Sequence, residues 1–304
     1  QLDLPLKLDE LKIKQPDKSR LRDLYARLQF KTWLTELGGA NDEVSAEAEY
    51  DTVLDQSALD DWLNKIRQKC IFSFDTETTD LDAMQAEIVG LSFAVEPGKA
   101  AYVPLSHDYP GAPAQLDHVQ VLEQMKPLLE NEEIKKIGQN LKYDMKVLAN
   151  YGISLKGIEH DTMLESYVLD STSSRHDLDT LAMKHLGHKT IHFEEIAGKG
   201  KKQLKFNDIA LEQASPYAAE DADITLRLHE RLWPALEKHE KLASIYREIE
   251  MPLLSILAKV ERNGVRIDAG MLKRQSSELA QGILDLERIT VKDIMVPRGA
   301  IEGI

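Results

Sequence analysis

Two acidic side chains follow an apolar segment, at a place where a buried strand would normally carry neither. Ile71 to Phe74 read as a strand, and Asp75 and Glu77 come directly after it in the stretch IFSFDTETTD. Residues two apart in a strand point to one face, so these two carboxylates are expected to lie close together. Repulsion between them and loss of their hydration both disfavour the charged forms. Divalent cations bound between them would make such a pair tolerable.

Two further acids have the setting expected of cation ligands. Asp144 lies one turn into a predicted helix over 141–152, past the position at which an aspartate caps a helix. Tyr217 and Asp221 are four residues apart in a predicted helix over 214–239 and therefore share a face. Carboxylate oxygens select Mg²⁺ or Mn²⁺, and two such ions about 4 Å apart support in-line phosphoryl displacement. The acids together indicate a two-metal site, whereas each one alone could be a surface solubiliser or a cap.

Other polar clusters have simpler explanations than catalysis. Asp161 begins a predicted helix over 161–170 and fits an N-cap. The lysine-rich segment 198–206 lacks the spacing of a phosphate-binding loop and is interpreted as a solvated loop. Cys70 has no evident catalytic partner, so covalent acyl chemistry is not expected. Ordinary polar roles are also favoured over zinc for four histidines without a nearby cysteine, namely His176, His185, His188 and His192.

The elements that must position these residues form an α/β pattern. Strands are predicted at 70–74, 87–96, 100–105, 135–140 and 157–160, and helices at 57–66, 118–131, 141–152, 161–170, 175–187 and 214–239. Pro97 and Gly98 predict a hairpin turn, and Ser57 with Asp60 resembles a helix N-terminal cap. Pro234 is expected to kink or end the last of these helices. The order of elements argues for one mixed sheet flanked by helices.

Bulk properties fit a soluble globular chain. It has 304 residues, of which 42% are hydrophobic and 30% charged, and no apolar run of about 18 residues that would predict a membrane span. The net charge of −14 argues against broad binding to phosphate backbones unless a basic strip or metal ions offset it. Without a visible secretory signal, and with Cys70 as the only cysteine, the expected location is the cytoplasm.

Three short stretches resemble the exonuclease motifs of the bacterial DNA polymerase I family (family A). They are FDTET at 74–78, GQNLKYD at 138–144 and YAAEDAD at 217–223, and the likeness extends over about residues 1–285. The resemblance implies a ribonuclease H-like 3′-5′ exonuclease of the proofreading type. Such an enzyme would hydrolyse the 3′ end of single-stranded or frayed DNA to nucleoside monophosphates, with two Mg²⁺ or Mn²⁺ ions.

The resemblance also implies a role for each matched residue. Asp75, Glu77 and Asp221 would hold the ion that activates water, with Asp75 bridging to a second ion that Asp144 supports. Tyr217 would orient the attacking water. The implied substrate-binding residues are Leu81, Gln139, Asn140, Tyr143 and Phe193. The leucine and the phenylalanine would pack against the terminal bases, a contact that tolerates any sequence.

The same resemblance divides the chain into regions. Residues 1–37 are interpreted as a remnant of the 5′-nuclease region, 38–49 as a linker, 50–240 as the exonuclease domain, 241–284 as the start of a truncated polymerase region, and 285–304 as an unrelated tail. The tail resembles the segment preceding the CBS domains of bacterial ion-efflux-associated proteins, and no function is assigned to it. DNA synthesis is not expected, because the polymerase palm and fingers are missing. Neither a membrane nor an obligate protein partner is expected, and an RNA 3′-end exonuclease or a non-catalytic scaffold remains an alternative.

Overall fold

A computed structural model describes residues 16–28, 30, 33, 37, 48–172 and 175–286. It divides the chain into two units, Gln1–Arg262 and Asn263–Ile304. Nearly all of the predicted linker and tail lies outside the described residues.

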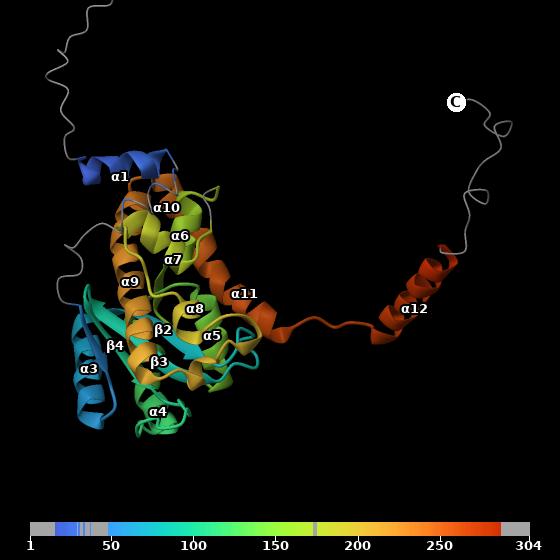
Figure 1. Cartoon of the computed structure of the whole chain (residues 1–304), viewed down its shortest axis with the longest axis horizontal. Helices are drawn as coiled ribbons and strands as arrows, with labels where there is room; N and C mark the ends of the chain where they lie inside the picture. Colours follow the sequence, from blue (N-terminus) through green and yellow to red (C-terminus); the bar gives the residue numbers. More distant parts are fainter. Residues whose placement is uncertain are drawn as a thin grey trace, which may run out of the picture. The chain divides into compact units, whose positions relative to one another are not determined.

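A six-stranded mixed sheet forms the centre of the first unit (Figure 1). Its strands are β1 (Glu49–Thr52), β2 (Ile71–Thr78), β3 (Ile88–Glu96), β4 (Lys99–Pro104), β5 (Lys135–Gly138) and β6 (Ile158–Asp161). They lie in the order β1-β4-β3-β2-β5-β6. The β2–β3 and β3–β4 pairs are antiparallel, and β1–β4, β2–β5 and β5–β6 are parallel. The predicted mixed sheet and its hairpins are confirmed, and the order is that of a ribonuclease H-like fold.

The antiparallel part of the sheet follows from local sequence. Pro97 and Gly98 form the predicted turn between β3 and β4, and Gly98 has a φ of +80°, a conformation that suits glycine. The adjoining strand β1 was not predicted as a strand. Its sequence, EYDT, is polar and mostly exposed, so it lacks the alternation that identifies a strand in a sequence.

The described part of the first unit also contains helices, several of which pack on the sheet. They are α1 (Lys18–Arg27), α3 (Gln56–Lys69), α4 (His118–Leu129), α5 (Leu141–Asn150), α6 (Thr162–Leu169), α7 (Leu178–Leu181), α8 (Phe193–Ala197), α9 (Leu211–Glu237), α10 (Glu240–Ile245) and α11 (Met251–Asn263). Single π-helical turns follow α7 and α10, at Ala182–Leu186 and Tyr246–Glu250, and 3₁₀ turns span Gly200–Lys202 and Phe206–Asp208. The second unit has one described helix, α12 (Ala269–Leu286).

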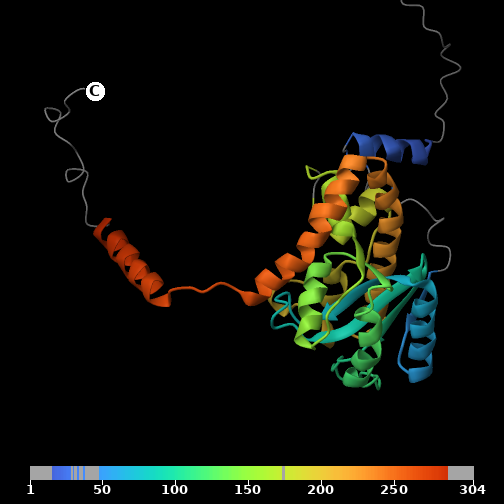
Figure 2. The same cartoon turned by 180° about the vertical axis from the view of Figure 1, so that it is seen from behind.

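Two apolar layers hold the helices against opposite faces of the sheet. Helices α3, α4 and α5 pack on the face that carries Phe72 and Phe74 of β2, in one continuous core cluster. Helix α9 packs on the other face through alanines, among them Ala218 and Ala222, which let its backbone approach the strands. Figure 1 shows α9 crossing the sheet, and Figure 2 shows the green helices α4 and α5 from behind. Burying each large side chain contributes about 1.5–3 kcal/mol.

Several predicted helix boundaries are wrong in detail. The N-cap of α3 is Asp55, which accepts a hydrogen bond from Ala58 N, rather than the predicted Ser57 and Asp60 pair. Pro234 does not end α9, which continues to Glu237, and the kink expected at this proline stays a prediction. The helix predicted at 175–187 is shorter, with α7 at Leu178–Leu181 followed by the π-helical turn at Ala182–Leu186.

The segment after α9 belongs to the compact first unit up to Arg262. Tyr246, Leu254 and Ala258 are buried, so this segment contributes to the core. By contrast, every residue whose exposure is described in the second unit, 263–285, is exposed. Among the described residues, no helix has both the length and the apolar character needed to cross a membrane.

Candidate active site

The face of β2 that carries the acids is directed toward α9. Ser73 Oγ donates a 2.6 Å hydrogen bond to the carbonyl of Ala222 on α9. Because side chains alternate along a strand, Asp75 and Glu77 share this face with Ser73. Glu77 is only 9% exposed, and its buried Oε1 has no hydrogen-bond partner. A buried carboxylate oxygen without a donor indicates a place for a bound cation.

The third acid reaches β2 from the opposite side. Asp144 lies in the first turn of α5 and is 1% exposed. Its Oδ1 accepts hydrogen bonds from Thr76 N at 3.0 Å and from Thr76 Oγ1 at 2.6 Å. The pairing of β2 with β5 ends at Ser73, so Thr76 lies beyond the ladder and its N–H is available. The short length of β5 therefore creates the place that Asp144 occupies.

Helix α9 contributes the fourth acid and the tyrosine. Asp221 and Tyr217 are one turn apart on α9. Burial and then the charge of Asp75 raise the pKa of Asp221, and the Tyr217 hydroxyl offsets only part of this rise. The Tyr217 ring lies 6.1 Å from Phe193 and 5.9 Å from Phe206, centroid to centroid. This aromatic packing holds Tyr217 in place, since each ring restricts the orientation of the next.

The charges of the four carboxylates raise the pKa values of one another. Burial raises the pKa of Asp75 to about 7. Burial also raises the pKa of Glu77 well above its usual value, and the charges of Asp75, Asp221 and Asp144 raise it further. Burial raises the pKa values of Asp144 and Asp221, and the charge of Asp75 raises them further. No lysine, arginine or histidine of the described chain offsets these shifts, so the protein itself does not neutralise this site.

The predicted substrate-binding residues occupy different environments. Leu81 is 94% exposed on the loop after β2, whereas Phe193 is partly buried beside Tyr217. The side-chain amide of Gln139 donates to the His176 carbonyl and accepts from Thr162 Oγ1, so both of its ends are already used within the protein.

The other two predicted substrate-binding residues, Asn140 and Tyr143, lie at the N-terminus of α5. Asn140 has a left-handed backbone with φ of +63°. The hydroxyl of Tyr143 contacts Thr78 Oγ1 and donates to the carbonyl of Asp80. It therefore connects α5 to the end of β2 and the loop that carries Leu81.

Sequence reasoning did not identify the residues that support the acids. Thr76 lies inside the FDTET stretch, but only the strand pairing shows that it binds Asp144. Glu220, next to Asp221, accepts hydrogen bonds from Ile191 N and pairs with His188, and it thereby attaches the segment before α8 to α9. Alternation of charged residues on α9 was the available signal for Glu220.

The histidines considered for zinc do not converge. His176 bonds Ser166, His188 pairs with Glu220 and His192 pairs with Asp179, each in a separate contact. Burial lowers the pKa of His185 to about 4, which keeps its ring neutral. Asp161 has the predicted capping role, since its carboxylate accepts from the N–H groups of Met163 and Leu164.

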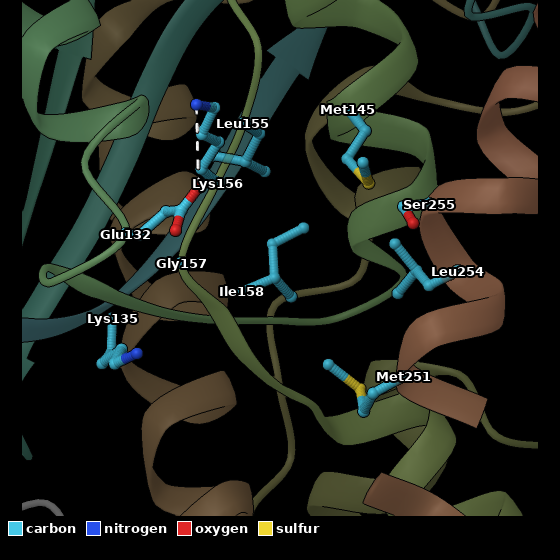
Figure 3. Close-up of a pocket in the computed structure, with 10 residues that line it drawn as sticks. All are labelled: Glu132, Lys135, Met145, Leu155, Lys156, Gly157, Ile158, Met251, Leu254 and Ser255. Atoms are coloured by element: carbon cyan, nitrogen blue, oxygen red, sulfur yellow. Dashed lines mark ion pairs between the residues drawn. The ribbon is translucent and has the colours of Figure 1, made fainter. Parts of the chain in front are cut away.

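A cavity of about 370 Å³ lies elsewhere, between α5, α11 and the connection into β6 (Figure 3). Its apolar lining includes Met145, Leu254 and Ile158. Lys156 and Glu132 form a 3.7 Å ion pair at its edge. None of the predicted site residues lines it.

The mixed sheet with α9 on one face and α3 to α5 on the other defines a ribonuclease H-like α/β protein. Residues 50–237 match the model of a family described as 3′-5′ exonuclease. The chain is 52% identical over 299 residues to DNA polymerase I of Pseudomonas aeruginosa, a match covering 94% of this chain and 33% of that protein. It is 44% identical over 255 residues to DNA polymerase I of Rhizobium leguminosarum, covering 78% and 25%.

Solved structures show the same fold at lower identity. The polymerase domain of Pol1 from M. smegmatis, in complex with DNA primer-template and dNTP, has a TM-score of 0.61 at 21% identity, covering 81% of this chain and 41% of that one. Brucella melitensis NrnC has a TM-score of 0.50 at 18% identity, covering 71% and 92%. The chain belongs to the 3′-5′ exonuclease family, in the form found in bacterial DNA polymerase I. It spans about a third of the P. aeruginosa relative and a quarter of the R. leguminosarum one.

Proposed function

We propose that this chain hydrolyses the 3′ end of single-stranded or frayed DNA and releases nucleoside monophosphates, as a proofreading-type exonuclease. One observation carries the proposal. Asp75, Glu77, Asp144 and Asp221 come together from β2, α5 and α9 inside the span that matches the exonuclease family, and no basic side chain of the described chain neutralises them.

The donor set fits divalent metal ions. The four residues offer only carboxylate oxygens, which suit hard cations such as Mg²⁺ or Mn²⁺. Glu77 Oε1 is buried without a partner and needs a positive charge beside it. We assign all four acids as metal ligands. Bound cations would neutralise charge on the phosphodiester and acidify the attacking water.

The side chains of the chain itself position the reactants. Tyr217, one turn before Asp221 on α9, would orient the attacking water beside that carboxylate. The bond from water oxygen to phosphorus forms while the bond from phosphorus to the 3′ oxygen of the preceding nucleotide breaks. Thr76 keeps Asp144 fixed through two hydrogen bonds, so that this carboxylate does not reorganise during the reaction.

The terminal nucleotides would lie between apolar side chains. Leu81 is almost fully exposed, so its side chain is accessible to a base of the bound strand. Phe193 lies against Tyr217 and offers an aromatic face for a base. Asn140 and Tyr143, at the start of α5, would contact the strand. Gln139 supports this region through His176 and Thr162, and we assign it a positioning role.

Flanking regions would extend this domain. We propose that 1–37 and 241–284 correspond to parts of the neighbouring 5′-nuclease and polymerase regions. The 94% coverage of this chain by a DNA polymerase I supports the proposal. In this organisation α10 and α11 pack against the exonuclease domain through buried side chains, Ala243 on α10 and Leu254 on α11.

Digestion of a 5′-labelled single-stranded DNA tests the function. With Mg²⁺ the labelled products should shorten stepwise from the 3′ end, and with EDTA they should remain intact. Asp75→Ala and Asp221→Ala should reduce the rate by at least about 10³-fold, the size of losing a principal charge-stabilising group. Asp61→Ala is the matched control, because Asp61 is exposed on α3, and it should keep the parental rate.

The same assay separates the alternatives. A matched RNA strand that is degraded faster than DNA would identify an RNA 3′-end exonuclease. Full activity in the Asp75→Ala, Asp221→Ala double variant would contradict the proposed site. A folded parent protein without metal-dependent activity on either polymer would favour a scaffold.

A further inference from the structure

Two histidines and a glutamate form a buried cluster apart from the four acids. His160 ends β6, Glu165 lies in the first turn of α6, and His229 lies on α9. The Nδ1 atoms of His160 and His229 lie 3.0 and 2.8 Å from Glu165 Oε1. One potential ligand atom from each residue falls within 4.8 Å of the other two. We propose that these residues form a second metal site, selective for a transition metal such as Zn²⁺.

The hydrogen bonding within the cluster is incomplete. His229 Nδ1 makes a hydrogen bond with Glu165 Oε1, but His160 Nδ1 is buried without a hydrogen-bond partner despite its short distance. Glu165 is 0% exposed, and its second oxygen, Oε2, also lacks a partner. Each such buried atom costs about 1–3 kcal/mol. A cation between the three side chains would satisfy both atoms at once.

The charges of Glu165 and the two histidines also favour a bound cation in this cluster. Within the described part of the chain, the ion pairs of Glu165 are with the two histidines alone. The histidine rings are 4.0 Å apart between centroids, so charging both would place two cations in contact. A single metal ion held by two neutral imidazoles would supply the positive charge that Glu165 needs, without that repulsion.

The ligand types select the metal. Two imidazole nitrogens and up to two carboxylate oxygens are a borderline donor set, which suits Zn²⁺ and other late divalent ions. The four acids near β2 offer oxygen only and suit harder ions. Excess Mg²⁺ should therefore occupy the acidic site and leave the histidine site to Zn²⁺ or Co²⁺.

Aromatic rings enclose the cluster and provide a reporter. The ring centroid of Trp233 lies 4.6 Å from that of His160, and Tyr246 lies 5.4 Å from Trp233. The Tyr246 hydroxyl also accepts a hydrogen bond from Asp161 N, next to His160. A paramagnetic ion bound to the histidines should quench the fluorescence of Trp233. Since the ligands come from β6, α6 and α9, the ion would also connect these elements.

Metal titration of the full chain tests the proposal. With millimolar Mg²⁺ present at pH 7.5, the parent should bind one Co²⁺ per chain, with visible absorption and tryptophan quenching, and Zn²⁺ should displace it. His229→Gln and Glu165→Gln should each weaken binding by at least about 100-fold, since even outer partners of ligands cost about 10–100-fold. His239→Gln, an exposed histidine just after α9, is the matched control and should bind like the parent.

Two further variants make the result decisive. Asp75→Ala should keep the Co²⁺ signal, because it alters only the acidic site. Trp233→Phe should keep the absorption and lose most of the quenching, which locates the ion even if the ligand variants fold poorly. Absence of saturable Co²⁺ or Zn²⁺ binding in the parent, or unchanged quenching in Trp233→Phe, would overturn the proposal and leave a hydrogen-bonded cluster only.

Discussion

At the scale of single residues, the acidic site can bind cations, but it lowers the stability of the metal-free folded protein. Four carboxylates share a buried region, and Glu77 experiences the charge of the other three. Without cations, this arrangement opposes folding, because the unfolded chain would separate the charges. Residues that bind cations are therefore expected to be those whose removal stabilises the metal-free protein.

Glu77→Gln tests whether the buried acids destabilise the metal-free protein. The substitution removes one buried charge at nearly constant shape, so in EDTA at pH 8 it should raise the free energy of unfolding, by about 0.5–2 kcal/mol as for other stabilising substitutions. Activity with Mg²⁺ should fall sharply. Urea unfolding measures the first effect, with Glu132→Gln on an exposed residue as the control. An unchanged or lower stability in EDTA would contradict the interpretation.

The pH dependence of the metal-free protein follows from Asp75. Its pKa is about 7 in the folded chain and near its usual value of 3.8 when unfolded, so the folded state binds more protons between these values. Stability should therefore decrease as the pH rises from about 4 through 7. Urea midpoints at pH 5 and 8 in EDTA check this. Mg²⁺ should restore more stability at pH 8 than at pH 5, and an opposite order would contradict it.

At the scale of elements, a single carboxylate fixes the start of two helices. Asp161 accepts hydrogen bonds from Met163 N and Leu164 N of α6. It also accepts from Asn140 N and Leu141 N, where α5 begins without a side-chain cap of its own. Asp161 therefore sets the position of the helix that presents Asp144.

Asp161→Ala should accordingly cost more than the loss of one ordinary cap. We expect a loss of about 2–4 kcal/mol in the free energy of unfolding, and lower activity because α5 shifts. Asp117→Ala is the matched control, since Asp117 caps only α4, through Gln120 N. Its cost should be about 1 kcal/mol with activity unchanged. Equal effects of the two substitutions in urea unfolding would contradict the shared role.

The link from β2 to α5 can be tested in the same way. Thr76→Val removes the 2.6 Å hydrogen bond to Asp144 and should cost about 1–3 kcal/mol of stability. If the carboxylate then moves, the rate of hydrolysis should fall about tenfold, the equivalent of 1.4 kcal/mol. Thr76→Ser keeps the hydroxyl and should behave like the parent. A parental rate in Thr76→Val would show that the hydroxyl is dispensable.

The sequence predicts most strands and the long helices well, because the apolar residues of each recur on the face that packs against the core. It also identifies Asp75 and Glu77, since two acids at the end of a buried strand are unusual. It does not predict β1 or the dual role of Asp161, because both depend on contacts between segments far apart in the chain. The buried group of His160, Glu165 and His229 was missed for the same reason.

At the scale of the whole molecule, the two units differ in what holds them together. The first has continuous apolar cores, whereas residues 263–285 of the second are all exposed, including Leu279 at 70%. A segment of this kind contributes little to the stability of the first unit.

Removal of residues 263–304 should therefore leave the exonuclease domain intact. We expect the free energy of unfolding to change by less than about 0.5 kcal/mol, as for surface substitutions, and the nuclease rate to stay the same. Thermal unfolding and the labelled-strand assay measure these quantities. A companion truncation after Glu237 removes the buried Tyr246 and Leu254 and should lower stability by several kcal/mol. Similar behaviour of the two truncations would contradict the division at Arg262.

The short strand β5 has a consequence for how such a domain could gain or lose its chemistry. If β5 were two residues longer, its backbone would pair with Thr76 and exclude the carboxylate of α5 from that edge. An insertion in the segment between β5 and α5 could thus inactivate the enzyme while every acidic residue persisted. Inspection of acidic motifs alone would classify such a protein as active, and only the length of one backbone ladder would reveal that it is not.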